Sequence, residues 1–126
     1  MSNFITTDFN QVFRDRTKRF SVSIIKSLSP LPYSDDLSVI RKQIIRSATS
    51  VAANYRAVSR ARSDKERFAK LCIVVEEIDE TQLWLDIIEE LEYLSHEKIL
   101  HLKQECEELV KVMTSYKFKL SQSKTP

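Results

Sequence analysis

The amino-acid sequence predicts an all-α protein, an up-down-up-down antiparallel four-helix bundle. The first reason is that its 126 residues include no glycine, which sheets usually need in hairpins and bulges but short helix–helix turns do not. The second is that apolar residues recur at spacings of three and four along four segments. The third is that 42% hydrophobic and 30% charged residues suit one core. We therefore expect a single domain over residues 1–126, with helices at about 8–28, 36–62, 64–93 and 96–119.

The first predicted helix, residues 8–28, has one apolar side and a defined end. Thr7 is its candidate N-cap residue. The helix ends where Pro30 and Pro32 enter the linker SPLPYSDD, because proline cannot donate the helical hydrogen bond. Its apolar side consists of Phe9, Phe13, Phe20, Ile24 and Leu28.

The second predicted helix, residues 36–62, is expected to form an antiparallel hairpin with the third. The sequence SDKE at their junction fits a capping box. In that box Ser63 accepts a hydrogen bond from the Glu66 amide, and the Glu66 side chain bonds the Ser63 amide. Such a tight reversal predicts that the two helices pack side by side. The apolar stripe of the second helix consists of Leu37, Ile40, Ile44, Ala48, Val51, Tyr55 and Val58.

The third predicted helix, residues 64–93, carries two apolar faces. One face consists of Phe68, Leu71, Val74, Val75, Ile78, Leu85 and Ile88. The other consists of Leu83, Trp84, Ile87 and Leu91. A helix that is apolar on two sides is expected to be buried on both, by the bundle and by a second subunit. We therefore predict that Trp84, Ile87 and Leu91 contribute to a subunit interface.

The fourth predicted helix, residues 96–119, follows a short break near Leu94 and Ser95. Its apolar residues keep a strict three-four spacing, which is typical of a coiled-coil-like seam. The seam consists of Ile99, Leu102, Cys106, Leu109, Met113 and Tyr116.

The cysteines and the hydropathy indicate a reduced, non-membrane environment. Cys72 and Cys106 lie inside apolar helical patterns without Cys-x-x-Cys spacing, so both are expected to be reduced core thiols. The first residues lack the long apolar segment of a signal peptide, and no apolar run approaches the roughly 20 residues of a membrane helix. We expect a cytoplasmic protein that does not associate with membranes.

The stretch SATSVAANY, residues 47–55, is rich in small residues and predicts a close contact between the second and third helices. If the chain reverses near Ser63, Arg46 and Ser47 lie level with Glu80. A buried polar group left unpaired costs about 1–3 kcal/mol, so Asn54 is predicted to pair with a neighbouring helix. A binding role for this stretch is the alternative. The predicted polar seam consists of Arg46, Ser47, Ser50, Asn54, Glu77 and Glu80.

The charges divide unequally along the chain. Residues 1–70 carry fourteen Lys/Arg against six Asp/Glu, whereas residues 71–126 carry six against twelve. Two interpretations remain open: the halves neutralise one another within or between subunits, or part of the basic half faces an anionic partner. Under the second interpretation, the candidate nucleic-acid contacts near the hairpin tip are Arg56, Arg60, Arg62, Lys65 and Lys70.

Familiar catalytic and metal-binding patterns are not found in the sequence. The acidic run at residues 76–80 lacks the Glu-x-x-His pairs of a carboxylate-bridged metal bundle, and His96 and His101 are five residues apart, off a common helical face. Without glycine there is no phosphate loop or nucleophile elbow. We expect no enzyme, catalytic residue, cofactor or metal site. A weaker alternative is an enzyme or small-ligand binder with a pocket near Asn54 and Tyr55.

The middle of the chain carries a distinctive set of residues. They are Gln43, Arg46, Ser47, Thr49, Ser50, Asn54, Tyr55, Arg60, Ala61, Arg62, Ser63, Phe68, Lys70, Leu71, Glu76, Glu77, Glu80, Thr81, Trp84 and Leu85. The stretch that contains them, residues 43–94, closely resembles the bacterial four-helix-bundle proteins of the 23S rRNA intervening-sequence, or S23-like, family. It is distantly similar to the accessory variability protein of diversity-generating retroelements, a basic pentamer that works with a reverse transcriptase and nucleic acid. The resemblance implies an up-down four-helix bundle and a ring of five subunits.

These observations lead to one functional hypothesis and a rival. The leading hypothesis is a non-enzymatic homo-oligomer, a pentamer, that acts as a scaffold or adaptor and binds RNA or DNA, or a nucleic-acid-processing protein. The rival is a protein-interaction module without nucleic-acid binding, whose basic residues pair with Glu76, Glu77 and Glu80 inside the oligomer. It predicts that Arg46 and Arg60 are engaged by carboxylates.

Overall fold

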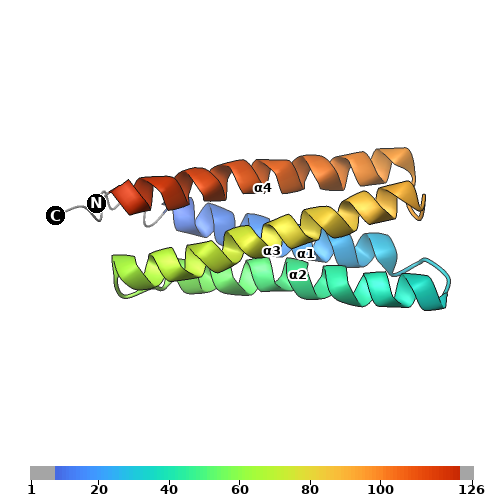
Figure 1. Cartoon of the computed structure of the whole chain (residues 1–126), viewed down its shortest axis with the longest axis horizontal. Helices are drawn as coiled ribbons and strands as arrows, with labels where there is room; N and C mark the ends of the chain where they lie inside the picture. Colours follow the sequence, from blue (N-terminus) through green and yellow to red (C-terminus); the bar gives the residue numbers. More distant parts are fainter. Residues whose placement is uncertain (1–7, 123–126) are drawn as a thin grey trace.

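The fold is a bundle of four antiparallel α-helices. The computed structural model describes residues 8–122, and no strand occurs within them. The helices are α1 (Asn10–Leu28), α2 (Asp35–Ser59), α3 (Asp64–Glu90) and α4 (His96–Gln122). Figure 1 shows that each helix runs opposite to the one before it. The predicted all-α, up-down-up-down bundle is therefore confirmed.

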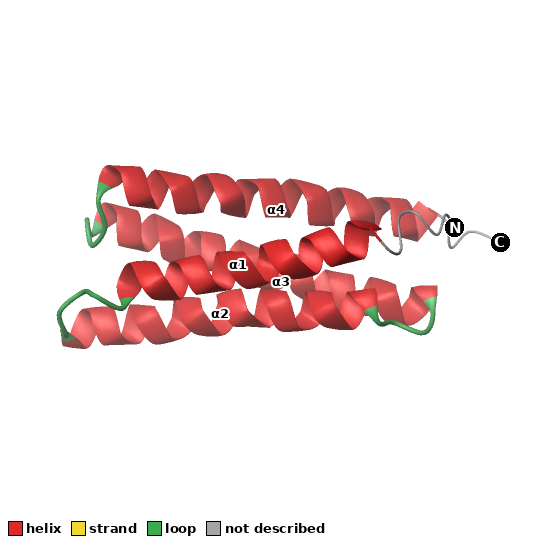
Figure 2. Cartoon of the chain, turned by 180° about the vertical axis from the view of Figure 1, so that it is seen from behind, coloured by secondary structure: helices red, strands yellow, loops and turns green. Residues whose placement is uncertain are grey.

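The four helices form two layers. Seen from behind, α1 and α2 lie side by side as the nearer layer, with α3 and α4 beyond them (Figure 2). The α2–α3 pair packs most extensively, and the α1–α4 pair packs less than any pair of sequence-adjacent helices. The start of α1 and the end of α4 lie at the same end of the bundle as the α2–α3 reversal (Figure 1). Sequence-adjacent helices therefore supply the main packing.

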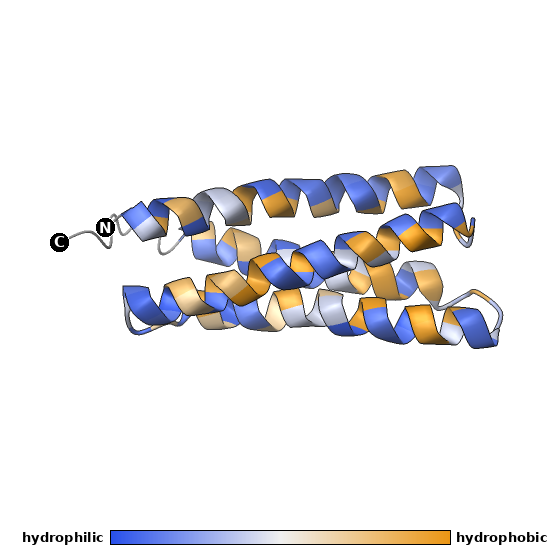
Figure 3. Cartoon of the chain, viewed as in Figure 1, coloured by the Kyte–Doolittle hydropathy of each residue, from blue (hydrophilic) through white to orange (hydrophobic). Residues whose placement is uncertain are grey.

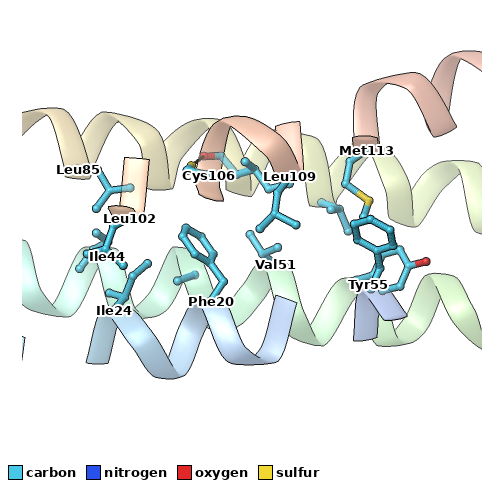
Figure 4. Close-up of a cluster of buried hydrophobic side chains, with 14 of the residues drawn as sticks. Phe20, Ile24, Ile44, Val51, Tyr55, Leu85, Leu102, Cys106, Leu109 and Met113 are labelled. Atoms are coloured by element: carbon cyan, nitrogen blue, oxygen red, sulfur yellow. Dashed lines mark hydrogen bonds between the residues drawn. The ribbon is translucent and has the colours of Figure 1, made fainter. Parts of the chain in front are cut away.

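The core runs along the bundle axis and receives side chains from every helix. Figure 4 shows Ile24 of α1 near Ile44 of α2, Leu85 of α3 and Leu102 of α4, and Met113 beside Tyr55 farther along the same core. Burying one large aliphatic or aromatic side chain stabilises the fold by about 1.5–3 kcal/mol. All seven positions of the predicted α2 stripe are buried, and the stripes of the other helices are buried or packed against the core. The predicted core stripes are confirmed.

Serine side chains begin α2 and α3. Ser34 Oγ accepts a hydrogen bond of 3.1 Å from the Leu37 amide, and Ser63 Oγ accepts one of 3.1 Å from the Glu66 amide. The second half of the predicted capping box differs, since the Glu66 carboxylate lies 3.8 Å from Arg62. The predicted N-cap residue of the first helix, Thr7, lies outside the described residues.

Three helix ends lie three residues from the predicted ones: α2 and α3 end earlier, and α4 extends to Gln122 instead of residue 119. α2 ends at Ser59, because Arg60 leaves the helical dihedral angles with φ −110° and ψ 9°. α3 ends at Glu90 in a Schellman motif, in which the Tyr93 amide donates to the Ile88 carbonyl at 3.3 Å. Its left-handed position is taken by Glu92, with φ 58°, although glycine is the usual residue there. The absence of glycine therefore concealed this end in the sequence.

Candidate functional site

The contact between α2 and α3 centres on two buried hydroxyl groups. Ser47 Oγ and Thr81 Oγ1 lie 2.8 Å apart, and both residues are fully buried. Thr81 Oγ1 also lies 2.8 Å from the Glu77 carbonyl oxygen, and Ser47 Oγ lies 3.2 Å from that of Ile44. Each hydroxyl is therefore hydrogen-bonded inside the bundle, as buried polar groups require. Thr81 is a partner of the seam that sequence reasoning missed.

An ion-pair cluster lies beside these hydroxyls. Arg46 of α2 contacts the carboxylates of both Glu77, at 3.4 Å, and Glu80 of α3. Trp84 Nε1 donates a hydrogen bond of 3.1 Å to Glu80. Hydrogen bonds from Arg46 first and Trp84 second lower the pKa of Glu80. Four of the predicted seam residues are thus brought together at the α2–α3 contact.

The prediction for Asn54 is wrong. Its Nδ2 donates to the Ser50 carbonyl oxygen at 2.9 Å and to Ser50 Oγ at 3.0 Å. Both acceptors lie one turn earlier on α2, not on a neighbouring helix. Asn54 and Ser50 are only half-buried, so the amide can be satisfied within its own helix. The buried polar contact between the two helices is instead the hydrogen-bonded pair Ser47 and Thr81.

The small residues of α2 bring it close to α1 as well as to α3. Ser21 Oγ of α1 donates a hydrogen bond of 2.8 Å to the Ala48 carbonyl oxygen. Side-chain access to a helix carbonyl on a neighbouring helix requires a close approach of the two backbones. Tyr55 adds a second link, since its hydroxyl donates to Asn10 Oδ1 at 3.0 Å.

A surface hollow lies between α1 and α2, which Figure 2 shows side by side on the near face. Its volume is about 440 Å³, and we call it the α1–α2 hollow. The cationic residues that line it, called the hollow cations below, are Arg14, Lys18, Arg56 and Arg60. The remaining lining residues are Gln11, Asp15, Ala52 and Ala53.

The hollow cations have no carboxylate partner within the described residues. No carboxylate oxygen of residues 8–122 lies within 4.0 Å of their charged nitrogens. Arg14 is held by two neutral acceptors, Gln11 Oε1 at 2.6 Å and Ser59 Oγ at 3.3 Å. Arg16, which lies two residues after Arg14 on α1, differs because it makes two hydrogen bonds of 2.7 and 3.0 Å to Glu105. The guanidinium of Arg14 is therefore fixed in position with its charge uncompensated.

Comparison with known protein families shows which family this chain belongs to. The model of a family described as 23S rRNA-intervening sequence protein matches residues 10–115, which cover α1 to most of α4. The chain belongs to the 23S rRNA-intervening sequence protein family. The predicted resemblance to the 23S rRNA intervening-sequence, or S23-like, family is confirmed, whereas the distant similarity to the accessory variability protein stays a prediction.

A solved structure supports the same family assignment. It is a Bacteroides thetaiotaomicron protein described as having unknown function and as coming from the S23 ribosomal protein family. The sequences are 30% identical, the TM-score is 0.76, and the match covers 86% of this chain and 96% of that chain. Among curated proteins, none matches the chain.

The predicted nucleic-acid contacts separate into two groups in this family member. Arg56 and Arg60 line the α1–α2 hollow. Arg62 and Lys65 are exposed beyond it, and Lys70 is half-buried on α3. The α1 contributors to the hollow, Arg14 and Lys18, were missed as site residues, since only the register between α1 and α2 places them opposite Arg56. That register follows from the contacts of Ser21 and Tyr55 described above.

The second apolar face of α3 is partly covered in the single chain. Trp84 and Ile87 are half-buried against the core, whereas Leu83 and Leu91 are 52% and 50% exposed. Figure 3 shows hydrophobic residues alternating with hydrophilic ones along α3. The role of Trp84, Ile87 and Leu91 in a subunit interface stays a prediction.

Metal-binding groups, thiols and membrane-spanning segments are the remaining features that bear on function. Within residues 8–122 no group of three or more His, Cys, Asp and Glu side chains is placed to hold a metal ion. Cys106 is buried and Cys72 half-buried, and both are free thiols. Burial first, and nearby carboxylates second, raise the pKa of Cys106 to about 12. No helix of the described chain has the length and apolarity needed to span a membrane.

Proposed function

We propose that this member of the 23S rRNA-intervening sequence protein family is a non-enzymatic, homo-oligomeric scaffold or adaptor that binds RNA or DNA through the α1–α2 hollow. The observation that carries the proposal is the set of four hollow cations without a carboxylate within 4.0 Å in the described residues. The family description refers to an intervening sequence of 23S rRNA, which makes RNA the first probe.

The electrostatics of the hollow favour a phosphate backbone. Its lining has four cations and one carboxylate, that of Asp15. A cation that neutralises a phosphate releases condensed counterions, so affinity falls with added salt. With three or four contacts, the slope of log affinity against log salt is expected to be about −2 to −4.

The test compares charge loss inside and outside the hollow. Fluorescence anisotropy measures binding of labelled single-stranded RNA and DNA over a salt series. The double variant Arg56→Gln/Arg60→Gln is expected to lose about tenfold or more in affinity and to flatten the salt slope by about one to two. Its matched control, Arg62→Gln/Lys65→Gln, removes the same charge at the same end of the bundle but outside the hollow.

Two results would overturn the nucleic-acid part of the proposal. One is no retention of RNA or DNA even at about 50 mM salt, where phosphate contacts are strong. The other is an equal loss of affinity in the two double variants, since that would mean diffuse attraction rather than binding in the hollow.

The rival function, a protein-interaction module, is favoured by one observation. Arg46 is already engaged by Glu77 and Glu80, as that hypothesis requires. Arg60, in contrast, lines the hollow without such a partner in residues 8–122. Retention of an unchanged oligomer together with complete failure to bind RNA and DNA would favour this rival.

Assembly is the second part of the proposal, with a pentamer as the form that the family resemblance implies. It is supported by the half-exposed Leu83 of α3 and Leu91, which directly follows that helix. Light scattering after gel filtration measures the mass. Leu91→Glu is expected to shift the oligomer towards monomer, whereas Leu100→Glu, at an exposed position of α4, is not. A monodisperse wild-type monomer at micromolar concentration would exclude the assembly.

A further inference from the structure

The α1–α2 hollow has a shape as well as a charge. Its α2 side is lined by Ala52 and Ala53, so the cations stand around short side chains. Ala53 is exposed. Replacing it with a residue that has a larger side chain would fill part of this space. The hollow is therefore a recess into which a group can enter, and not only a row of cations on a convex helix.

The charge of the recess exceeds what one backbone phosphate needs. Four cations and the Asp15 carboxylate leave a net charge of +3 in its lining. An internal phosphodiester of RNA or DNA carries one negative charge. A phosphate monoester carries about 1.5 to 2 at neutral pH and offers three acceptor oxygens. Guanidinium groups bind such oxygens with two parallel hydrogen bonds, and Arg14 is already held in position by Gln11 and Ser59.

The size of the recess also exceeds that of a phosphate. Its volume of about 440 Å³ lies within the range of sites for small organic ligands, roughly 300–1,000 Å³. Beside the cations lie a carboxylate and an amide, joined by the 3.4 Å hydrogen bond from Gln11 to Asp15. The Asp15 oxygens accept hydrogen bonds of the kind that sugar hydroxyls and base amino groups donate.

We propose that the α1–α2 hollow binds the phosphate monoester of a nucleotide, as the phosphorylated end of a nucleic-acid strand or as a free mononucleotide. The inference rests on the proposed nucleic-acid function and names the group that enters the site. Arg14, Arg56 and Arg60 bind the phosphate oxygens, and Asp15 faces the sugar or base.

The first experiment varies the end of the strand. One RNA sequence, labelled on an internal base, is prepared with a 5′-phosphate, with a 3′-phosphate or with hydroxyl groups at both ends. Binding is measured by anisotropy at about 150 mM salt, where exposed charges more than about 8 Å apart are largely screened. At least one phosphorylated strand is expected to bind about fivefold tighter than the hydroxyl strand, the effect of one further unit charge near a solvated cation.

A steric variant separates the recess from general basic charge. Ala53→Leu keeps every cation and fills the recess, and leucine is a good helix former. It is expected to remove the preference for the phosphorylated strand, so that the phosphorylated and hydroxyl strands bind the variant with equal affinity. The matched control is Ala69→Leu, at an exposed position of α3 outside the hollow, and unchanged melting temperatures verify that both variants fold.

Competition identifies the source of the phosphate. Adenosine monophosphate and adenosine are each titrated against the phosphorylated strand, with inorganic phosphate as a third competitor. Displacement by the monophosphate but not by adenosine supports the proposal. Direct binding of the monophosphate as tight as that of the strand end assigns the site to free nucleotides, and much weaker binding assigns it to strand ends.

The failures of the two proposals are distinguishable. Equal affinity for phosphorylated and hydroxyl strands, or an unchanged preference in Ala53→Leu, overturns the monoester site while salt-dependent RNA binding still supports the proposed function. Binding of the monophosphate without any RNA or DNA binding overturns the proposed function and supports the site. Absence of binding in every arm overturns both.

Discussion

The hydroxyl groups of Ser47 on α2 and Thr81 on α3 are hydrogen-bonded at 2.8 Å in a part of the bundle that solvent does not reach. A slide of one helix along the other by a single residue moves the two Cα atoms apart by about 1.5 Å. The pair therefore favours one register of the two helices that pack most extensively.

Removing one hydroxyl of this pair is expected to destabilise the protein. Thr81→Val keeps the shape of the side chain and lowers the free energy of unfolding by about 1 kcal/mol, measured by urea denaturation. In a double-mutant cycle, Thr81→Val and Ser47→Ala together are expected to cost less than the sum of the single changes. Thr49→Val, at an exposed position of α2, is the control. Strict additivity would argue against the pair as a unit.

Tyr55→Phe is expected to lower the free energy of unfolding by about 1–3 kcal/mol. The Tyr55 hydroxyl donates to Asn10 Oδ1 at 3.0 Å, and both residues are buried. The substitution leaves the Asn10 oxygen without that donor. Tyr33→Phe is the matched control, because Tyr33 is 74% exposed, and it should change stability little. Equal effects of the two substitutions would contradict the importance of the buried bond.

Glu80 predicts a pH dependence of stability. Arg46, and then Trp84, lower its folded-state pKa below the ordinary value of 4.5. The unfolded state therefore takes up a proton first as the pH falls, so the stabilisation is complete above pH 4.5 and is lost as the pH falls through the folded-state pKa. The difference in unfolding free energy between wild type and Glu80→Gln should shrink in that acid window.

The measurement is urea denaturation of both proteins between neutral pH and about pH 3, which lies below the ordinary carboxyl range. Glu76→Gln, at an exposed position of the same helix, serves as the control for general charge effects. A difference that stays constant over the whole range for Glu80→Gln would refute the assignment.

The two cysteines are expected to differ in reactivity. Cys106 is buried, and its thiol has a pKa raised to about 12, so very little reactive thiolate forms at neutral pH. Cys72 is only half-buried. Iodoacetamide treatment of the native protein, followed by peptide mass spectrometry, should modify Cys72 first and Cys106 only on unfolding. Similar labelling rates for both cysteines in the native protein would show that the α4 seam opens readily.

The sequence was sufficient for the fold because every helix has a clear apolar period. The members of the α2 stripe from Leu37 to Val58 recur at spacings of three and four, and all of them are buried. Helix starts with serine caps were also predictable, as at Ser63. The C-terminal ends of the helices were harder to predict. After α3, Glu92 adopts the left-handed conformation at a position where a glycine would have marked the helix end in the sequence.

The candidate site could be predicted only in part. Arg46 and Glu80 were paired correctly because they are level across a hairpin with a short turn. Predicting the hollow would have required knowing the register of α1 against α2. A linker of several residues between the two helices does not determine that register. Asn54 was misassigned because periodicity gives the direction of a side chain approximately, and a half-buried amide can find acceptors in its own helix.

The two-layer arrangement has an electrical consequence. Residues 10–59, the α1–α2 layer, carry nine Lys/Arg against three Asp/Glu, and residues 64–122, the α3–α4 layer, carry eight against fourteen. The net charges are thus +6 and −6 on opposite sides, and a single chain is a dipole across its short axis. A nearby polyanion exerts a torque on such a molecule and turns the α1–α2 layer towards itself before contact, most strongly at low ionic strength.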